Sequence, residues 1–221
     1  MRIMWIFCLC LGAAVTIVQA LTQSSSETPI SWIQTYSYQE SSGELRRLYD
    51  LVRGASGNID NVVKVHSLRP HTLEGHYTLY KSILHHPDNV LPPETLEALG
   101  VYTSMLNGCE YSATHHFEGL RRVVDDDARA AAIEDALATD QPEAVFSGKV
   151  LALLRYARKL TLSPREMTKA DVDALREAGA DDGEILEANQ VVGYFNYANR
   201  TLDGLGVTLS GDVIGTSPRT R

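Results

Sequence analysis

The stretch from residue 97 to 116 holds four side chains whose types and spacing suit chemistry. Cys109 is followed by Ser112 three positions later and by His116 seven positions later, and Glu97 lies twelve positions before it. Offsets of three and seven place side chains on one helical face, about one and two turns apart. A thiol near an imidazole and a carboxylate has the parts for redox or nucleophilic chemistry. A buried structural cysteine beside unrelated polar residues is the alternative.

The residues just before Cys109 predict that it opens a new helix. Asn107 and Gly108 form a helix-breaking pair. The free N–H groups and the dipole at a helix N-terminus favour a thiolate, so this position is expected to lower the thiol pKa.

The elements that must position these residues are predicted to be helices. Apolar residues recur at helical spacing along most of the chain, and no stretch beyond the N-terminal apolar run alternates like a strand for long. The main predicted helices run from about Thr72 to His85, Pro93 to Leu106, Cys109 to the acidic residues 125–127, and 181 to 204. We therefore expect an all-α helical bundle.

Three local signals bound or interrupt these helices. Residues 41–44 form a capping-box pattern ahead of a helix, and Thr168 is expected to cap another. Pro70 is expected to stop the short apolar stretch 62–68. Asn189, Asn196 and Asn199 recur near core-facing positions of the last helix. Three roles are open for them: a polar network within the bundle, a contact with another subunit, or exposure to solvent at the edge of the helix.

Composition narrows the class of protein. The 221 residues suffice for one domain with a sizeable core. A formal net charge of −8 argues against nucleic acid as a partner. Of the three cysteines, Cys8 and Cys10 lie in the N-terminal apolar run, so the body has one thiol and forms no internal disulfide.

Residues 1–20 are predicted to be a secretory signal peptide. Arg2 precedes an apolar run from residue 5 to 18, and Val18-Gln19-Ala20 offers a small-residue cleavage site. The alternatives are an uncleaved membrane anchor and a start codon assigned too early, which would leave a cytoplasmic protein. A polar linker at 21–29, a domain at 30–207 and a loose tail at 208–221 complete the expected organisation, in a secreted or periplasmic protein.

The remaining histidines are expected to be structural. His66, His71 and His76 are five residues apart, which does not place them on one helical face, and His85 and His86 precede a proline at a helix end. A zinc site built from Cys109, His115 and His116 would lack a clear fourth ligand. The sequence has no Gly-rich phosphate loop, no His-Glu-x-x-His motif and no nucleophile-elbow serine, and no cofactor is expected.

The pattern Glu97-x11-Cys109-x2-Ser112-x3-His116 resembles the Glu-x11-Cys-x2-Cys-x3-His signature of alkylhydroperoxidase D-like proteins, in the carboxymuconolactone decarboxylase superfamily. The similarity covers roughly residues 30–207 and is closest to the branch called peroxidase-related enzymes. Further motifs in the family order are Ser31-Trp32-Ile33, His66-Ser67-Leu68-Arg69-Pro70, Asn107-x-Cys109-x-Tyr111 and Phe195-Asn-x-x-Asn199-Arg200-x-x-x-Gly204-Leu-Gly206.

The resemblance implies an all-helical bundle that assembles into trimers or hexamers. It implies an antioxidant peroxidase that reduces organic hydroperoxides and is recycled by an external thiol reductant. On this basis Glu97 is the proton-relay acid, Cys109 the first motif cysteine and His116 the relay histidine.

Ser112 departs from the family pattern because it replaces the second motif cysteine. A hydroxyl is neither oxidised by peroxide nor able to form a disulfide, so the two-cysteine cycle is excluded. Cys109 then acts alone, with Ser112 donating a hydrogen bond to the thiolate and His116 holding it ionised, or the site is a degenerate binding module without turnover. Lactone decarboxylation, the superfamily's other activity, is a third alternative.

Overall fold

The computed structural model describes residues 29–53 and 57–215, and within these residues the chain is helical with no strand. The all-α prediction is confirmed. The predicted signal peptide and most of the predicted linker lie outside the described residues. The elements are α1 (Gly43–Val52), α2 (Asn61–Lys64), α3 (Pro70–Leu84), α4 (Pro93–Asn107), α5 (Glu110–Val124), α6 (Asp127–Ala138), η1 (Pro142–Ala144), α7 (Gly148–Leu162), η2 (Pro164–Glu166), α8 (Lys169–Glu177) and α9 (Asp182–Gly204).

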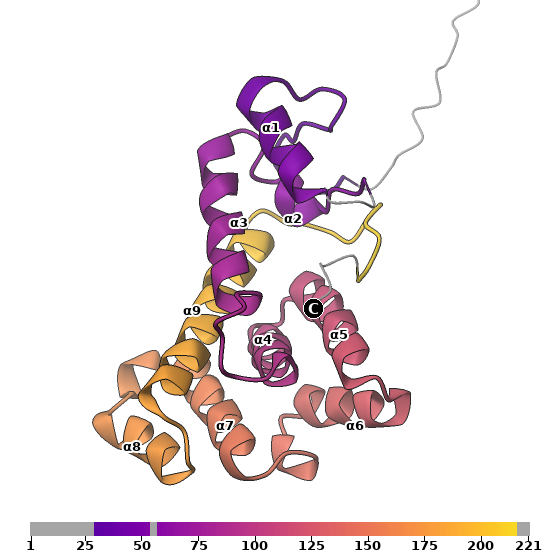
Figure 1. The fold of residues 1–221 in the computed structure, drawn as a ribbon. Helices are drawn as coiled ribbons and strands as arrows, with labels where there is room; N and C mark the ends of the chain where they lie inside the picture. The colour runs from indigo at the N-terminus through magenta and orange to yellow at the C-terminus, as the bar shows by residue number, and fades with distance from the viewer. Residues whose placement is uncertain (1–28, 54–56, 216–221) are drawn as a thin grey trace, which may run out of the picture.

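Helix α4 is the centre of the bundle (Figure 1). Every residue from Thr95 to Ser104 is buried, so the helix is covered on all sides. Pro93 suits its first turn, because a proline there removes no intrahelical hydrogen bond. Gly108 ends it at φ 73°, a left-handed conformation that glycine adopts without strain.

Helices α5, α6, α7 and α9 surround α4, and all of them contribute to one large hydrophobic core. The contact between α4 and α9 is close at Gly100. A methyl group at that position would lie 2.3 Å from the ring of Phe195, so glycine allows the two helices to approach. This approach places α9 beside the part of α4 that carries Glu97.

A second, smaller core joins α1 and α3. It contains Leu45, Leu48, Tyr49, Ile59 and Leu73. The N-terminal part of the chain is therefore a separate layer packed on the main bundle.

The capping box expected at residues 41–44 is absent. The N-cap residue of α1 is Ser42, whose side chain makes no capping bond, and Ser41 Oγ donates to the backbone oxygen of Tyr38. The stretch 62–68 ends before Pro70 as expected, and Pro70 itself begins α3, since proline is well suited to the first turn of a helix. The cap predicted at Thr168 is present, and it takes the form of a capping box with Asp171.

The three asparagines of α9 bond to neighbouring side chains of the bundle. Asn189 Nδ2 donates to Tyr156 Oη at 2.7 Å, and Asn196 Nδ2 lies 3.2 Å from Thr161 Oγ1. Asn199 is fully buried against Ser104. Of the alternatives considered, the internal polar network is the one that the structure shows.

The segment after α9 is not loose in its described part. Thr208 N donates to Ile30 O at 2.9 Å, and both side-chain oxygens of Asp212 accept from Asn61 N at 3.0 Å. The tail expected from residue 208 is therefore held on the domain as far as the structure describes it, to residue 215.

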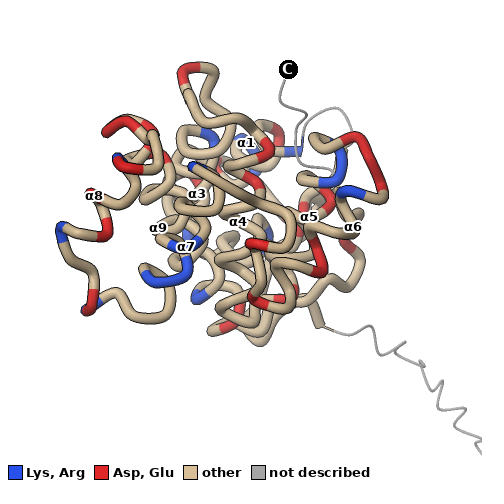
Figure 2. Tube along the Cα trace, turned by 90° about the horizontal axis from the view of Figure 1, so that it is seen from below, with Lys and Arg blue, Asp and Glu red and all other residues tan. Residues whose placement is uncertain are grey.

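Charged side chains are spread over the surface of the molecule. Basic residues in Figure 2 are interspersed with acidic ones along the outer helices instead of gathering on one face. Among the helices within residues 29–53 and 57–215, none has the length and apolar character needed to cross a membrane.

Candidate functional site

Glu97 and His116 form a buried pair between α4 and α5. His116 Nδ1 lies 3.0 Å from Glu97 Oε2, and the glutamate is 6% exposed. Gly119, one turn beyond His116, leaves room for the carboxylate, because a methyl group there would lie 3.2 Å from Glu97 Oε1. A carboxylate that accepts from Nδ1 fixes the ring orientation and leaves Nε2 as the nitrogen for chemistry.

Ser112 lies one turn before His116 on α5 and is buried. Its Oγ is 3.1 Å from Ser104 Oγ, which in turn donates to the backbone oxygen of Gly100 at 2.8 Å. Asn199 Nδ2 lies 3.3 Å from Ser104 Oγ. Ser112 thus belongs to a buried polar chain that links α5, α4 and α9.

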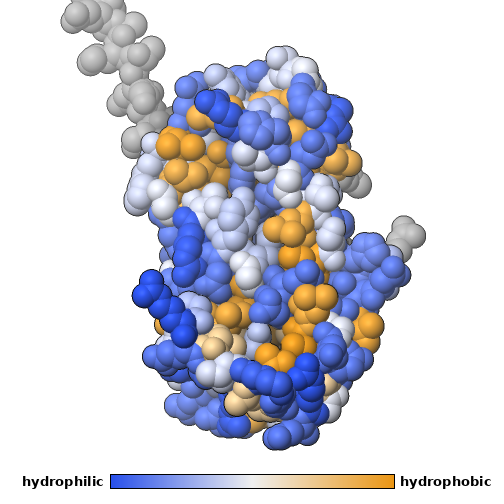
Figure 3. Space-filling model, turned by 90° about the vertical axis from the view of Figure 1, so that its left-hand side faces the viewer, coloured by the Kyte–Doolittle hydropathy of each residue, from blue (hydrophilic) through white to orange (hydrophobic). Residues whose placement is uncertain are grey.

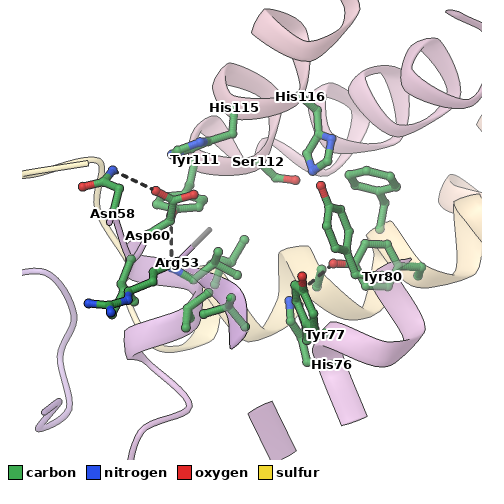
Figure 4. Close-up of a pocket in the computed structure, with 18 residues that line it drawn as sticks. Arg53, Asn58, Asp60, His76, Tyr77, Tyr80, Tyr111, Ser112, His115 and His116 are labelled. Atoms are coloured by element: carbon green, nitrogen blue, oxygen red, sulfur yellow. Dashed lines mark hydrogen bonds between the residues drawn. The ribbon is translucent and has the colours of Figure 1, made fainter. Parts of the chain in front are cut away.

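A cavity of about 110 Å³ opens beside Ser112 and His116, where the small N-terminal layer meets the main bundle (Figure 4). The predicted site residues Cys109 and Glu97 do not line it. Its walls are aromatic, apolar and polar side chains from α1, α3, α5, α9 and the segment around α2: Val52, Arg53, Asn58, Ile59, Asp60, Val62, Val63, His76, Tyr77, Tyr80, Tyr111, Ser112, His115, His116, Tyr194, Phe195, Ala198 and Leu202.

Tyr80 extends from α3 toward His116 across this pocket (Figure 4). The two rings meet edge to face with centroids 6.2 Å apart, and Tyr80 Oη lies 2.7 Å from His85 Nε2. Burial lowers the pKa of His85 to about 4, so this imidazole is neutral near pH 7. His85 therefore has a defined polar partner beyond its expected position at a helix end.

The pocket wall formed by His76 is also uncharged. Burial lowers the pKa of His76 to about 3, and the neighbouring His66 imidazole adds to the effect. The rings of His66 and His76 lie 4.7 Å apart although their sequence spacing suits no helix. They meet because His66 belongs to the turn before α3 and only His76 to α3 itself.

Cys109 is the N-cap residue of α5, as predicted, but its environment is the opposite of the expected one. The residue is 1% exposed, and burial raises the pKa of its thiol to about 12. The N–H groups of Ser112 and Tyr111 lower this pKa, whereas a hydrogen bond with Asp203 raises it. Burial exceeds the effect of the helix N-terminus, so the expectation of a lowered pKa is wrong for this conformation.

Asp212 is an ionisable residue near Cys109 that sequence reasoning missed. Its side chain has no exposed surface, Tyr111 Oη donates to it at 2.5 Å and His115 Nε2 lies 3.4 Å away. Both partners also line the pocket. Nothing in the polar sequence around Asp212 signals this role, because its partners lie about a hundred residues or more earlier in the chain.

Solved structures with the same architecture match almost the whole domain. An alkylhydroperoxidase AhpD core, an uncharacterised peroxidase-related protein from Ralstonia eutropha, is 24% identical with a TM-score of 0.71, over 84% of this chain and 98% of its own. An uncharacterised peroxidase-related protein from a Silicibacter species is 20% identical with a TM-score of 0.72, over 84% and 94%. This chain has the alkylhydroperoxidase D-like fold.

The same fold also occurs with another activity. The debrominase Bmp8 is 17% identical with a TM-score of 0.62, over 82% of this chain and 91% of its own. No protein-family model and no curated protein sequence matches the chain. Within the alkylhydroperoxidase D-like fold, the function must therefore be argued from the site itself.

The fold brings three of the four predicted site residues to one place. Ser112 and His116 line the pocket. Glu97 does not line it, but its Oε2 lies 3.0 Å from His116 Nδ1. Cys109 lies on the same helix but in a different cluster, with Tyr111 and Leu202. Among the described residues, no group of three His, Cys, Asp or Glu side chains is arranged to hold a metal ion, and the combination of Cys109, His115 and His116 is not one.

Proposed function

We propose that this protein binds a small, uncharged organic molecule in the aromatic pocket and transfers a proton on it through His116 and Glu97. The observation that carries the proposal is the 3.0 Å contact of Glu97 with an imidazole that also lines the pocket. A general base needs a free ring nitrogen near the reacting atom and a partner that orients the ring. His116 has both.

The pocket walls support the uncharged class of ligand. His76 is neutral near pH 7 because of burial, and much of the remaining wall is the rings of tyrosines and Phe195. Arg53 and Asp60 both lie at one side of the pocket (Figure 4), where Asn58 Nδ2 lies 3.4 Å from Asp60 Oδ1. An aromatic-lined cavity of this size suits a compact molecule of about one ring.

Reduction of organic hydroperoxides through Cys109 is a second candidate function. It is favoured by the position of this thiol at the start of the helix that carries Ser112 and His116, and by the peroxidase-related names of two structural neighbours. The thiol would become a sulfenic acid as the hydroperoxide becomes an alcohol. Two external thiols would then restore it, giving water and their disulfide. The burial of Cys109 requires that its cover moves first.

Hydroperoxide consumption separates the two functions. The wild type, Cys109→Ala and His116→Gln are mixed with cumene hydroperoxide and dithiothreitol, and dimedone-trapped sulfenate is measured by mass spectrometry at Cys109. The first function predicts equally slow consumption in all three proteins and no sulfenate. Sulfenate together with consumption that is lost in Cys109→Ala would establish the second function instead.

A ligand-binding measurement tests the first function directly. A panel of small uncharged cyclic compounds is screened by thermal shift against the wild type and Cys109→Ala. The compounds that bind are then tested against His116→Gln. We expect the wild type and Cys109→Ala to be stabilised by the same compounds, because Cys109 does not line the pocket. Proton exchange at an acidic C–H of the bound compound, followed by NMR in heavy water, is expected to slow in His116→Gln. Absence of any binding compound, or exchange unaffected by the substitution, would contradict the proposal.

We also propose that the chain is a homo-oligomer, a trimer or hexamer as the family resemblance implies. Figure 3 shows hydrophobic patches on the side of the molecule where α3 and α9 lie. Exposed Leu79, Leu186 and Tyr197 belong to these helices. Light scattering of the purified protein tests this, since a monomer at micromolar concentration contradicts it.

Secretion or export to the periplasm is likewise a proposal. It is supported by the apolar run behind Arg2 and the small-residue site that ends at Ala20. Mass spectrometry of the protein made in its own cells would show a chain that begins after Ala20. A chain that retains residues 1–20 would contradict cleavage.

A further inference from the structure

The described C-terminal segment, residues 207–215, packs against the small cluster that contains Cys109. Val207 and Leu209 pack against the cluster of Cys109, Tyr111 and Leu202, and Val62 closes another side. Within this cluster the cysteine is 1% exposed, although it is the N-cap residue of α5.

One buried carboxylate anchors the segment. Asp212 accepts from Asn61 N with both oxygens at 3.0 Å and from Tyr111 Oη at 2.5 Å, and it lies 3.4 Å from His115 Nε2. Hydrogen bonds to a charged acceptor are stronger than those between neutral groups. Since the carboxylate has no exposed surface, loss of these partners would leave a buried charge uncompensated.

The other hydrogen bonds of the segment to the rest of the chain involve Val207, Thr208 and Ser210, and Gly215 at its end lies close to Glu118 and Arg122 of α5. Asn61 Nδ2 donates to the backbone oxygens of Thr208 and Ser210, both at 2.8 Å, and Thr208 N donates to Ile30 O. Val207 and Leu209 belong to the small cysteine cluster and not to the large core around α4. Opening of the segment therefore leaves the main bundle intact, which is the condition for a local opening at low cost.

We propose that residues 207–215 are an autoinhibitory cover: while Asp212 is anchored, Cys109 is unreactive, and release of Asp212 exposes the thiol to solvent and to oxidants. Tyr111 connects this cover to the pocket, because it lines the pocket and donates to Asp212 at the same time; His115, also in the pocket wall, lies 3.4 Å from the same carboxylate. A ligand that shifts either side chain changes the anchor. The proposal does not depend on whether the pocket supports turnover.

Alkylation of Cys109 in the native protein tests the cover. The full chain is treated with iodoacetamide, and modification is read at the peptide that contains Cys109, so that Cys8 and Cys10 do not interfere. Asp212→Ala is expected to alkylate roughly tenfold faster or more, because it loses the charged acceptor of several hydrogen bonds. Val213→Ala is the matched control, since Val213 is the next residue and 55% exposed. It is expected to react at the wild-type rate.

Two further measurements keep the test decisive. Far-UV circular dichroism must show that Asp212→Ala keeps its helices. If Asp212→Ala loses them, Leu209→Ala is used instead, since it only shortens one side chain of the cover. Alkylation of Cys109 is also expected to be faster in Leu209→Ala than in the wild type. Hydrogen exchange of the wild type is expected to show faster exchange at Thr208 than in α4. A folded Asp212→Ala or Leu209→Ala with the wild-type alkylation rate would overturn the proposal, as would equal exchange in both regions. Neither readout requires peroxide or turnover, so failure here is distinct from failure of the proposed function.

Discussion

Single side chains decide which chemistry this site supports. Ser112 occupies a pocket-lining position one helical turn before His116, and it is the position where the family pattern has a thiol. Cys109 has a thiol, but this thiol is buried and not accessible to solvent. The pocket-lining position thus lacks sulfur, and the sulfur is in a position where burial raises the pKa of the thiol and favours its protonated form.

Restoring the missing sulfur tests this division of roles. Ser112→Cys places a thiol in the pocket beside His116, so we expect hydroperoxide consumption with dithiothreitol to rise roughly tenfold or more over the wild type. The assay follows loss of cumene hydroperoxide.

The control for this variant is Ser112→Ala, which removes the hydroxyl without supplying a thiol. It is expected to stay at the wild-type rate. If Ser112→Cys is no faster than Ser112→Ala, the pair of Glu97 and His116 is not poised to assist a thiol at this position.

At the scale of the elements, the crossing of α4 and α9 sets the shape of the pocket. Phe195 lies against Gly100 on one side, and its ring meets His116 edge to face with centroids 4.6 Å apart on another. The glycine therefore affects the position of a residue that contacts the proposed base.

Gly100→Ala is expected to destabilise the protein by about 1–3 kcal/mol, because the added methyl group would lie 2.3 Å from the Phe195 ring. Urea unfolding followed by circular dichroism measures the change. The matched control is Gly193→Ala on α9, where nothing lies within 4 Å of the added group. It is expected to gain up to about 1 kcal/mol from higher helix propensity. Similar effects of the two substitutions would contradict the close crossing.

The sequence predicted the helices better than it predicted the contacts between them. The helix from Pro93 and the one that follows Cys109 were predicted nearly to the residue, because apolar period, proline and glycine are local signals. Cys109 belongs to a cluster against which Val207 and Leu209 pack, about a hundred residues later, and no local pattern encodes that packing. The pair of Glu97 and His116 was expected from the family register, whereas Tyr80 required the packing of α3 on the bundle.

The molecule as a whole is a main bundle with a smaller N-terminal layer, and its buried histidines lie near their junction. His76 on α3 contacts Tyr194 of the bundle, with ring centroids 5.7 Å apart, and His85 bonds to Tyr80. Burial lowers the pKa of His66, of His76 to about 3 and of His85 to about 4. The burial of these imidazoles in the folded protein therefore favours their neutral form.

This preference makes the stability of the whole fold depend on pH in a defined window. An exposed histidine in the unfolded chain has a pKa of about 6.5, so below that pH the unfolded chain binds protons that the folded chain excludes. The full contribution is present above pH 6.5 and is lost as pH falls toward the folded values. Each buried histidine adds a slope of about 1.4 kcal/mol per pH unit within its window. Carboxylates whose pKa is lowered in the folded chain, such as Asp171 at about 2, change the free energy of unfolding only below about pH 4.

We therefore expect the free energy of unfolding, measured in urea, to fall between pH 7.5 and pH 5. His76→Phe removes one of the buried imidazoles and should reduce that slope by about 1 kcal/mol per pH unit, whatever it does to stability at pH 7.5. His71→Gln on the same helix is the control, because His71 is exposed, and its slope should match the wild type. An unchanged slope in His76→Phe would mean that His76 takes up protons equally in the folded and unfolded chains. The neutral pocket wall, and with it the preference for an uncharged ligand, would then have to be abandoned.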